Sequence, residues 1–217
     1  MRKSPLGSRR ILVIAPHPDD EVIAAWGLMR RLVATGAQVE LVVVTDGGAS
    51  HPQSSRWPRA RLVAERRRET RRAMRSLGVT PDRIRFLDLP DGALHLAPKR
   101  DWARFVQAVF RRRAPDLIVA PMDDDAHADH RAVAEALAEL PRRGERRLGY
   151  RVWPEGAGKA LNGIVIRLAH EMPIKRRTVR SYRTQAGRIT DAHAGFAMTH
   201  RHLRAFAAPT ERFATLG

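Results

Sequence analysis

The sequence contains no cysteine, and only 6% of its residues are aromatic. Without cysteine the chain forms no disulfide and no thiolate metal site, so any bound metal must be held by histidine and carboxylate side chains. No apolar run reaches the ~18–20 residues that span a bilayer. The apolar run after the basic N-terminus is short and ends in acidic residues, which predicts a first strand rather than a secretory signal peptide. These features favour a cytoplasmic protein.

Positive charge is in large excess. The chain carries 40 Lys and Arg residues against 23 Asp and Glu residues, a net charge of +17. Such an excess attracts anionic membrane surfaces, polyanionic glycans, anionic substrates or nucleic acid. It also fits an arginine-rich composition spread over solvated helix faces, and the sequence does not decide between these two interpretations.

Short apolar segments alternate with amphipathic stretches along most of the chain. At 217 residues the pattern predicts one domain, with a core over about 11–185 and a helical or loop extension over about 186–217. The alternation is typical of a Rossmann-like α/β three-layer sandwich around a mostly parallel sheet. Gly36 is expected to end the first helix. Strands are expected at 11–16, 39–46, 84–89, 117–122, 150–154 and 162–169, and helices at 20–34, 59–78, 101–113, 129–140 and 174–185.

Each of the first four expected strands leads into a polar cluster. The clusters are PHPDDE (16–21), TDGG (45–48), DLPDG (88–92) and DDDAHADH (123–130). Because the carboxyl ends of parallel strands meet at one edge of an open sheet, these segments are expected to form one site there. Dinucleotide binding fits poorly, because the first strand–helix turn lacks G-x-G-x-x-G and its aspartates would repel a pyrophosphate.

A divalent metal ion accounts for the crowding of ionisable groups after the first strand. His17 and Asp20 can both point inward from one turn at a helix start, and His130 or His127 can reach them from the fourth strand. Two histidines and one carboxylate with an open position form a catalytic zinc site, with ligand distances of about 2.0–2.2 Å, and also suit Fe(II). Asp19 is then free to take a proton from an attacking water.

These residues also have purely structural explanations. Asp20 can cap a helix, Glu21 can favour a helix N-terminus, and two histidines three residues apart often only share a helix face. The metal interpretation therefore rests on two clusters meeting at the ends of two strands.

The motifs resemble those of the PIG-L (LmbE-like) family of zinc-dependent N-deacetylases, which act on N-acetylglucosamine conjugates. The resemblance rests first on APHPDDE (15–21), TDGG (45–48), PDG (90–92) and HADHR (127–131). RRRETRRAMRSLGV (66–79) is similar to the family's R-x-x-E…LG helix, which places Arg66 and Glu69 on its motif. KRRTVRSYRTQ (175–185) resembles its late helix, with Lys175, Tyr182 and Gln185 in register. The resemblance runs from Ile11 to about Gln185.

The resemblance implies a role for each residue of the two main clusters. His17, Asp20 and His130 would be the zinc ligands. Asp19 would be the general base that activates water against the acetamide carbonyl.

Other positions of the motifs would assist the reaction. His127 would stand beside the developing oxyanion as an imidazolium, and Asp129 would orient or charge that histidine. Arg66 and Asp91 are weaker candidates for holding the sugar. The chain departs from the family at Ala128, in place of a proline, and at Thr184, in place of a serine. Neither change removes a polar group of the expected site.

The sequence thus predicts a zinc hydrolase that removes acetyl from an N-acetylated amino sugar and releases acetate and a free amine. Its substrate would be a small molecule, or an anionic or lipid-linked glycoconjugate such as lipopolysaccharide. The protein itself would make peripheral contact with an anionic membrane or a polyanionic glycan, at the inner membrane surface. The alternative is a basic protein that binds nucleic acid or an anionic surface on a non-catalytic α/β scaffold. Specific nucleic-acid binding is not expected, because no recognition motif is visible. Oligomeric state cannot be inferred.

Overall fold

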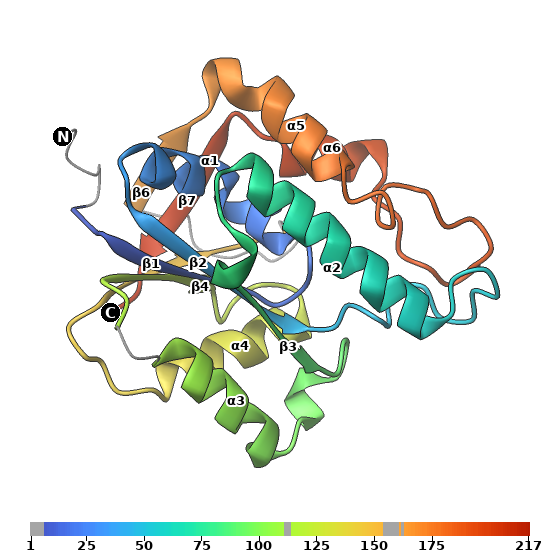
Figure 1. Cartoon of the computed structure of the whole chain (residues 1–217), viewed down its shortest axis with the longest axis horizontal. Helices are drawn as coiled ribbons and strands as arrows, with labels where there is room; N and C mark the ends of the chain where they lie inside the picture. Colours follow the sequence, from blue (N-terminus) through green and yellow to red (C-terminus); the bar gives the residue numbers. More distant parts are fainter. Residues whose placement is uncertain (1–6, 111–113, 154–160, 162) are drawn as a thin grey trace.

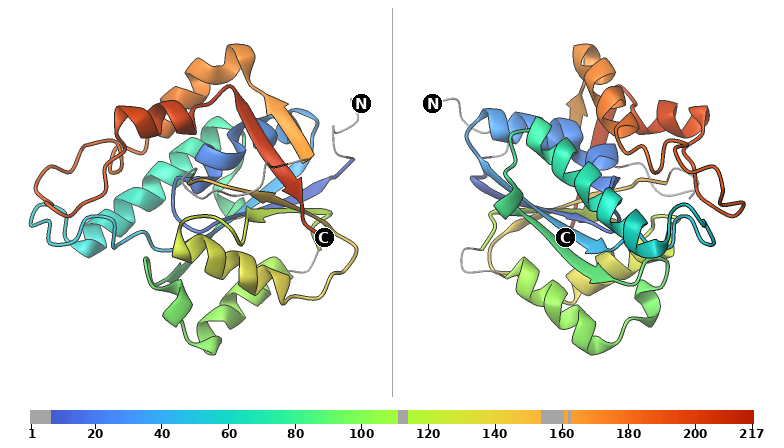
Figure 2. Two further views of the ribbon diagram at one scale, coloured as in Figure 1. Left: turned by 180° about the vertical axis from the view of Figure 1, so that it is seen from behind. Right: turned by 45° about the vertical axis from the view of Figure 1, so that its right-hand side comes forward.

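The computed structural model is a three-layer α/β sandwich, with a seven-stranded sheet between two layers of helices (Figure 1). It describes residues 7–110, 114–153, 161 and 163–217. Helices α1, α2, α5 and α6 cover one face of the sheet, and α3 and α4 cover the other (Figure 2). The strands are β1 Arg10–Ala15, β2 Gln38–Thr45, β3 Ile84–Leu89, β4 Leu117–Pro121, β5 Arg146–Tyr150, β6 Gly163–Arg167 and β7 Thr210–Thr215. The α-helices are α1 Asp20–Ala34, α2 Arg59–Ser76, α3 Lys99–Val109, α4 Ala128–Ala138, α5 Met172–Arg180 and α6 His200–Phe206.

The sheet confirms the predicted fold class. Its order is β3-β2-β1-β4-β5-β7-β6, with β1 to β5 parallel and β7 antiparallel to both of its neighbours. The chain runs outward from β1 to β3 and then returns to place β4 on the other side of β1. The carboxyl ends of β1 and β4 therefore form the switch point at which α/β sheets bind ligands.

The first, second and fourth strands are apolar throughout their centres because both of their faces are covered. Alternate side chains enter opposite cores. Val13 and Val43 pack beneath α1 and α2, whereas Ile14 and Val42 pack against α3 and α4. All four side chains are fully buried.

Two glycines end the helices that carry the site. Gly36 has φ 81°, its N–H donates to the Val33 carbonyl at 2.9 Å, and the next N–H, of Ala37, donates to Leu32 at 3.1 Å. This pair of hydrogen bonds forms the Schellman motif, which requires a residue in the left-handed conformation and so favours glycine. The predicted role of Gly36 is confirmed. Gly78 ends α2 in the same way, with φ 85°.

The C-terminal third departs most from expectation. The predicted strand 150–154 is wrong in position, since β5 covers Arg146–Tyr150. The predicted helix 174–185 ends at Arg180, and the segment expected to be helix or loop contains β7. Residues 111–113, 154 and 162, at the ends of predicted elements, lie outside the described residues. Among the described residues, no helix is both long and apolar enough to cross a membrane.

Helix α1 has a kink at Ala25, where φ is −132° and ψ is 16°. The N–H groups of Gly27 and Leu28 donate to the two carboxylate oxygens of Glu211, at 2.8 and 3.0 Å. The Ile23 carbonyl accepts the ammonium of Lys175 at 2.7 Å, and Lys175 also contacts Glu211 at 2.8 Å. A buried ion pair thus replaces helical hydrogen bonds at the kink.

Candidate metal centre and active site

The four polar clusters meet at the carboxyl edge of the sheet, as the sequence predicts. Segments that follow β1, β2, β3 and β4 line one cavity of about 480 Å³. Its polar lining comprises His17, Asp19, Asp20, Ser50, Arg66, Asp91, His127 and Gln185. Segments more than a hundred residues apart thus contribute to one site, because β1 and β4 are adjacent in the sheet.

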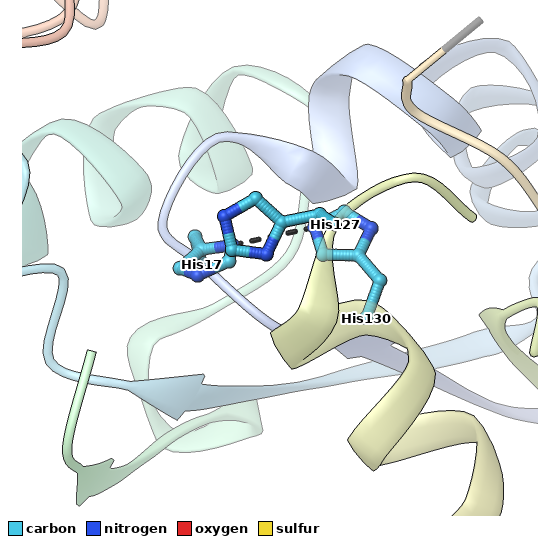
Figure 3. A group of neighbouring side chains, drawn as sticks. All are labelled: His17, His127 and His130. Atoms are coloured by element: carbon cyan, nitrogen blue, oxygen red, sulfur yellow. Dashed lines mark hydrogen bonds between the residues drawn. The ribbon is translucent and has the colours of Figure 1, made fainter. Parts of the chain in front are cut away.

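Three side-chain atoms in the site form a nearly equilateral triangle. His17 Nδ1 lies 3.2 Å from Asp20 Oδ2. His130 Nε2 lies 3.1 Å from Asp20 Oδ2 and 3.3 Å from His17 Nδ1. Figure 3 shows the rings of His17 and His130 turned toward each other from the end of β1 and the start of α4. All three side chains are almost completely buried.

These separations fit a divalent metal ion. Two ligand atoms at about 2.0–2.2 Å from a metal, at a tetrahedral angle, lie about 3.3–3.6 Å apart. Nitrogens of His17, His127 and His130 also lie within 4.8 Å of one another. We favour Asp20 over His127 as the third ligand, because it supplies a negative charge and the shorter separations.

Electrostatics favours positive charge beside Asp20. Burial opposes a charge on His17, but hydrogen bonds with Asp129 and Asp20 outweigh it and raise the pKa of His17 well above its usual value. Burial likewise opposes a charge on His130, yet the negative Asp20 raises the pKa of His130 to about 9. Burial would raise the pKa of Asp20, but the charge of His130 lowers it strongly. A cation bound here would replace the protons of the two histidines.

Carboxylates hold the far side of each histidine. Asp125 Oδ2 lies 3.3 Å from His130 Nδ1. Asp125 also accepts the backbone N–H groups of His127 at 2.9 Å and Val152 at 2.8 Å, so it is firmly placed. Such an outer carboxylate fixes which nitrogen of a histidine faces a metal. Sequence reasoning missed Asp125, although it belongs to the DDDAHADH cluster.

Asp129 has a different partner from the expected one. Its Oδ2 lies 3.1 Å from His17 Nε2, and its carboxylate accepts the N–H groups of Gly92 at 2.7 Å and Leu94 at 3.0 Å. Asp129 therefore orients His17, and only its backbone N–H contacts His127. Asp91, expected to hold the sugar, lines the cavity but also lies 3.2 Å from His17 Nε2.

The charge state of His127 also differs from expectation. Burial and the positive charges of His17 and His130 lower the pKa of His127, whereas an imidazolium was predicted. His127 Nδ1 accepts the N–H of Asp129 at 3.2 Å, which assigns the hydrogen of the neutral ring to Nε2. The ring keeps one N–H that can donate to a substrate.

Asp19 is held in an unusual backbone conformation, with φ 122°. Its N–H donates to Glu21 Oε2 at 3.0 Å, and its Oδ2 lies 3.4 Å from Arg66 Nη2. Arg66 is buried and donates to the carbonyls of Pro18 at 2.6 Å and Gly47 at 3.0 Å. Arg66 therefore joins the segments after β1 and β2, and the constraint on Asp19 is of the kind that surrounding structure maintains at functional sites.

The R-x-x-E motif on α2 and the late motif at 175–185 contact each other and the start of α1, and so support the site. The carboxylate of Glu69 on α2 accepts the N–H of Thr184 at 3.0 Å and its hydroxyl at 2.6 Å. The hydroxyl of Tyr182 contacts Glu21. The substitution of threonine for serine at 184 keeps the hydroxyl that Glu69 needs. These contacts hold the segment after α5 against α2 and against the start of α1, next to Asp19.

Fold and site together define a Rossmann-like α/β protein with a candidate divalent-metal centre where β1 and β4 end. Comparison with known proteins identifies its family. The PIG-L family profile, described as GlcNAc-PI de-N-acetylase, matches residues 12–140, which is more than half of the chain. The chain belongs to the PIG-L family.

Two of the relatives are named as deacetylases. A diacetylchitobiose deacetylase of Thermococcus kodakarensis is 30% identical over 128 residues, which are 57% of this chain and 45% of that protein. A probable N-acetyl-alpha-D-glucosaminyl L-malate deacetylase of Bacillus anthracis is 29% identical over 140 residues, which are 61% of each chain. The match thus spans about half the length of these relatives.

A solved structure confirms the fold. The N,N'-diacetylchitobiose deacetylase of Pyrococcus horikoshii superimposes with a TM-score of 0.75 and 22% identity, over 99% of this chain and 86% of that one.

Proposed function

We propose that the protein is a metal-dependent N-deacetylase, which hydrolyses the acetamide of an N-acetylglucosamine-type conjugate to a free amine and acetate. The observation that carries the proposal is the triangle of His17, Asp20 and His130 donor atoms, with Asp19 lining the same cavity. Zinc suits this ligand set, as does Fe(II). The names of the relatives reported above support the same reaction.

The residues of the site divide the chemistry between them. A divalent metal, when bound, would polarise the acetamide carbonyl and make water more acidic. Burial raises the pKa of Asp19 well above its usual value, although Arg66 lowers it, so this carboxylate can hold a proton taken from water. Asp19 would then pass the proton to the departing amine nitrogen. His127 would donate its N–H to the developing oxyanion.

The wider substrate proposal concerns anionic and lipid-linked glycoconjugates such as lipopolysaccharide. The net charge of +17 supports this substrate class. The same charge supports a second part of the proposal, that the protein is cytoplasmic and makes peripheral contact with an anionic membrane or a polyanionic glycan. Arg66 and Asp91 remain our candidates for holding the sugar, since both line the cavity. Activity on an anionic substrate should fall as salt rises, and a rate independent of ionic strength would remove this part of the proposal.

Metal content of protein purified without chelator tests the centre directly. We expect about one metal ion per chain in the wild type, and its loss from the double variant His17→Ala/Asp20→Ala. Asp19→Asn should keep the metal and the fold but lose about 10²–10⁴-fold in the release of free amine from N-acetylglucosamine conjugates. His193→Ala, at a histidine outside the cavity lining, is the control for both measurements. Full activity of Asp19→Asn would refute the role of the base.

Family membership does not favour the alternative, a basic nucleic-acid-binding scaffold. A cluster of buried aspartates occupies the ligand edge of the sheet, where it would repel phosphates. Salt-dependent retention on DNA would not distinguish the two functions, because any protein this basic shows some. A preference for particular DNA sequences would distinguish them, because it would favour the nucleic-acid-binding function.

A further inference from the structure

The lining of the cavity has two chemically different parts. One part consists of the metal-binding and acid–base side chains. The other is a set of apolar side chains, which we call the apolar wall: Ile23, Val152, Trp153, Phe196, Met198 and Phe206. Three of these residues come from the segment after Gln185, which contains none of the predicted site residues.

Aromatic rings form the centre of the apolar wall. The ring of Trp153 meets those of Phe196 and Phe206 edge to face, with centroids 5.5 and 5.7 Å apart. His202 lies flat against both phenylalanines, at 5.7 and 5.8 Å. Trp153 also stacks with His127 at 6.5 Å. The wall therefore reaches directly to the residue proposed to stabilise the oxyanion.

Hydrogen bonds and close packing hold the wall in place without a ligand. The Phe196 N–H donates to the Ser50 carbonyl at 2.8 Å, and the Met198 N–H donates to the Gln185 carbonyl at 2.7 Å. A Cβ added at Gly195 would lie 2.5 Å from the ring of His51, so the chain packs closely there. A preformed surface of this kind spares a ligand the free-energy cost of ordering it.

The start of α6 is fixed in the same way. Thr199 caps the helix, and its side chain and that of His202 form a reciprocal capping box. This cap sets the position of Phe206 at the other end of the seven-residue helix.

The wall is better suited to hydrocarbon than to a second sugar. A sugar ring there would need partners for its hydroxyl groups, and buried hydroxyls without partners cost free energy. Ser50 and Gln185, whose backbone carbonyls hold Phe196 and Met198, are already hydrogen-bonded to each other, with Gln185 Nε2 donating to Ser50 Oγ at 3.1 Å. Ile23, Val152 and Phe206 also line a neighbouring cavity of about 420 Å³, but charged side chains, among them Arg151, Lys175 and Glu211, line it as well, so it does not extend the apolar wall.

We propose that the apolar wall is a subsite for a hydrocarbon or aromatic substituent carried by the amino sugar. The natural substrate is then an N-acetylglucosamine conjugate with an apolar aglycone, and Trp153 and Phe196 determine the preference for it. This inference rests on the proposed deacetylase function and names the part of the substrate that the function leaves open.

Three substrates with the same acetamide test the inference: N-acetylglucosamine, diacetylchitobiose and hexyl N-acetyl-β-D-glucosaminide. Two buried methylenes already favour binding by about tenfold, so the hexyl glycoside should exceed both others in kcat/KM by about tenfold or more. Trp153→Ala and Phe196→Leu should each lose most of this advantage, measured as the ratio of kcat/KM on the hexyl glycoside to kcat/KM on N-acetylglucosamine. Trp102→Ala is the matched control, because Trp102 is also half-buried but lies on α3, away from the cavity.

Binding of hexyl β-D-glucoside, which has no acetamide, separates the wall from the reaction. Calorimetry should show binding to the wild type and the Trp102 variant, and weaker binding to the Trp153 variant. Equal kcat/KM for all three substrates would overturn the inference and leave the deacetylase function standing, and a preference for diacetylchitobiose would assign the wall to a second sugar. Wall-dependent binding of the glucoside without any deacetylation would support the subsite and refute the function.

Discussion

The buried pair of Lys175 and Glu211 should stabilise the protein chiefly through the backbone of α1. At the kink in this helix, Glu211 accepts two backbone N–H groups and Lys175 donates to one carbonyl. Lys175→Met removes one partner and leaves a buried carboxylate without its cation. Breaking a buried pair in this way costs about 3–5 kcal/mol.

The double variant Lys175→Met/Glu211→Leu distinguishes the backbone role from a simple ion pair. Replacing a whole buried pair by apolar residues of similar size is often neutral or stabilising. Here the Ile23 carbonyl and the N–H groups of Gly27 and Leu28 would also lose their partners, at about 1–3 kcal/mol each. We therefore expect the double variant to be less stable than the wild type by at least about 3 kcal/mol.

Urea unfolding followed by far-UV circular dichroism measures these free energies. Lys99→Met, at an exposed lysine on α3, is the control and should change stability by less than about 0.5 kcal/mol. A double variant as stable as the wild type would refute the reasoning. It would mean that α1 straightens at Ala25 and restores its own hydrogen bonds.

Four further outcomes are expected. Burial raises the pKa of Glu21 from 4.5 to about 7, so the protonated form stabilises the fold at low pH and this contribution is lost as pH rises through about 7. With chelator present, the free energy of unfolding of the wild type should therefore fall by about 3 kcal/mol relative to that of Glu21→Gln between pH 4.5 and 8. The same pH dependence of this free energy in both proteins, measured by urea unfolding, would contradict this. Asp125→Ala should weaken zinc binding about 10–100-fold in competition with a chelating dye, although it removes no proposed ligand; unchanged affinity would argue against its role. Zinc at a hundred times its Kd should raise the free energy of unfolding of the wild type by about 2.7 kcal/mol and leave that of His17→Ala unchanged, as measured by urea unfolding. Gly195→Ala should destabilise the fold by about 1–3 kcal/mol in the same assay, because its Cβ would meet His51 at 2.5 Å.

The first 140 residues were the most predictable from sequence because their signals are local. Four apolar segments correspond to β1 to β4, and Gly36 ends α1 as expected. Polar clusters at successive strand ends also predicted one shared site, since parallel strands place those ends along one edge.

The C-terminal strands were poorly predicted because their pattern depends on distant partners. β7 contains the buried Glu211, which interrupts the apolar alternation expected of a strand. Its charge is tolerated only because Lys175 and the amides of α1 surround it. No local rule reports such a partner.

Sequence alone was enough to restrict any metal to histidine and carboxylate ligands, because the chain has no thiol. It was also enough to bring His17, Asp20 and His130 to one edge of the sheet. The tertiary structure decided which groups surround them: Asp129 lies beside His17, Asp125 lies beside His130, and burial and neighbouring charges lower the pKa of His127. These pairings form across β1 and β4, and they depend on burial and on side-chain positions that neither segment specifies by itself.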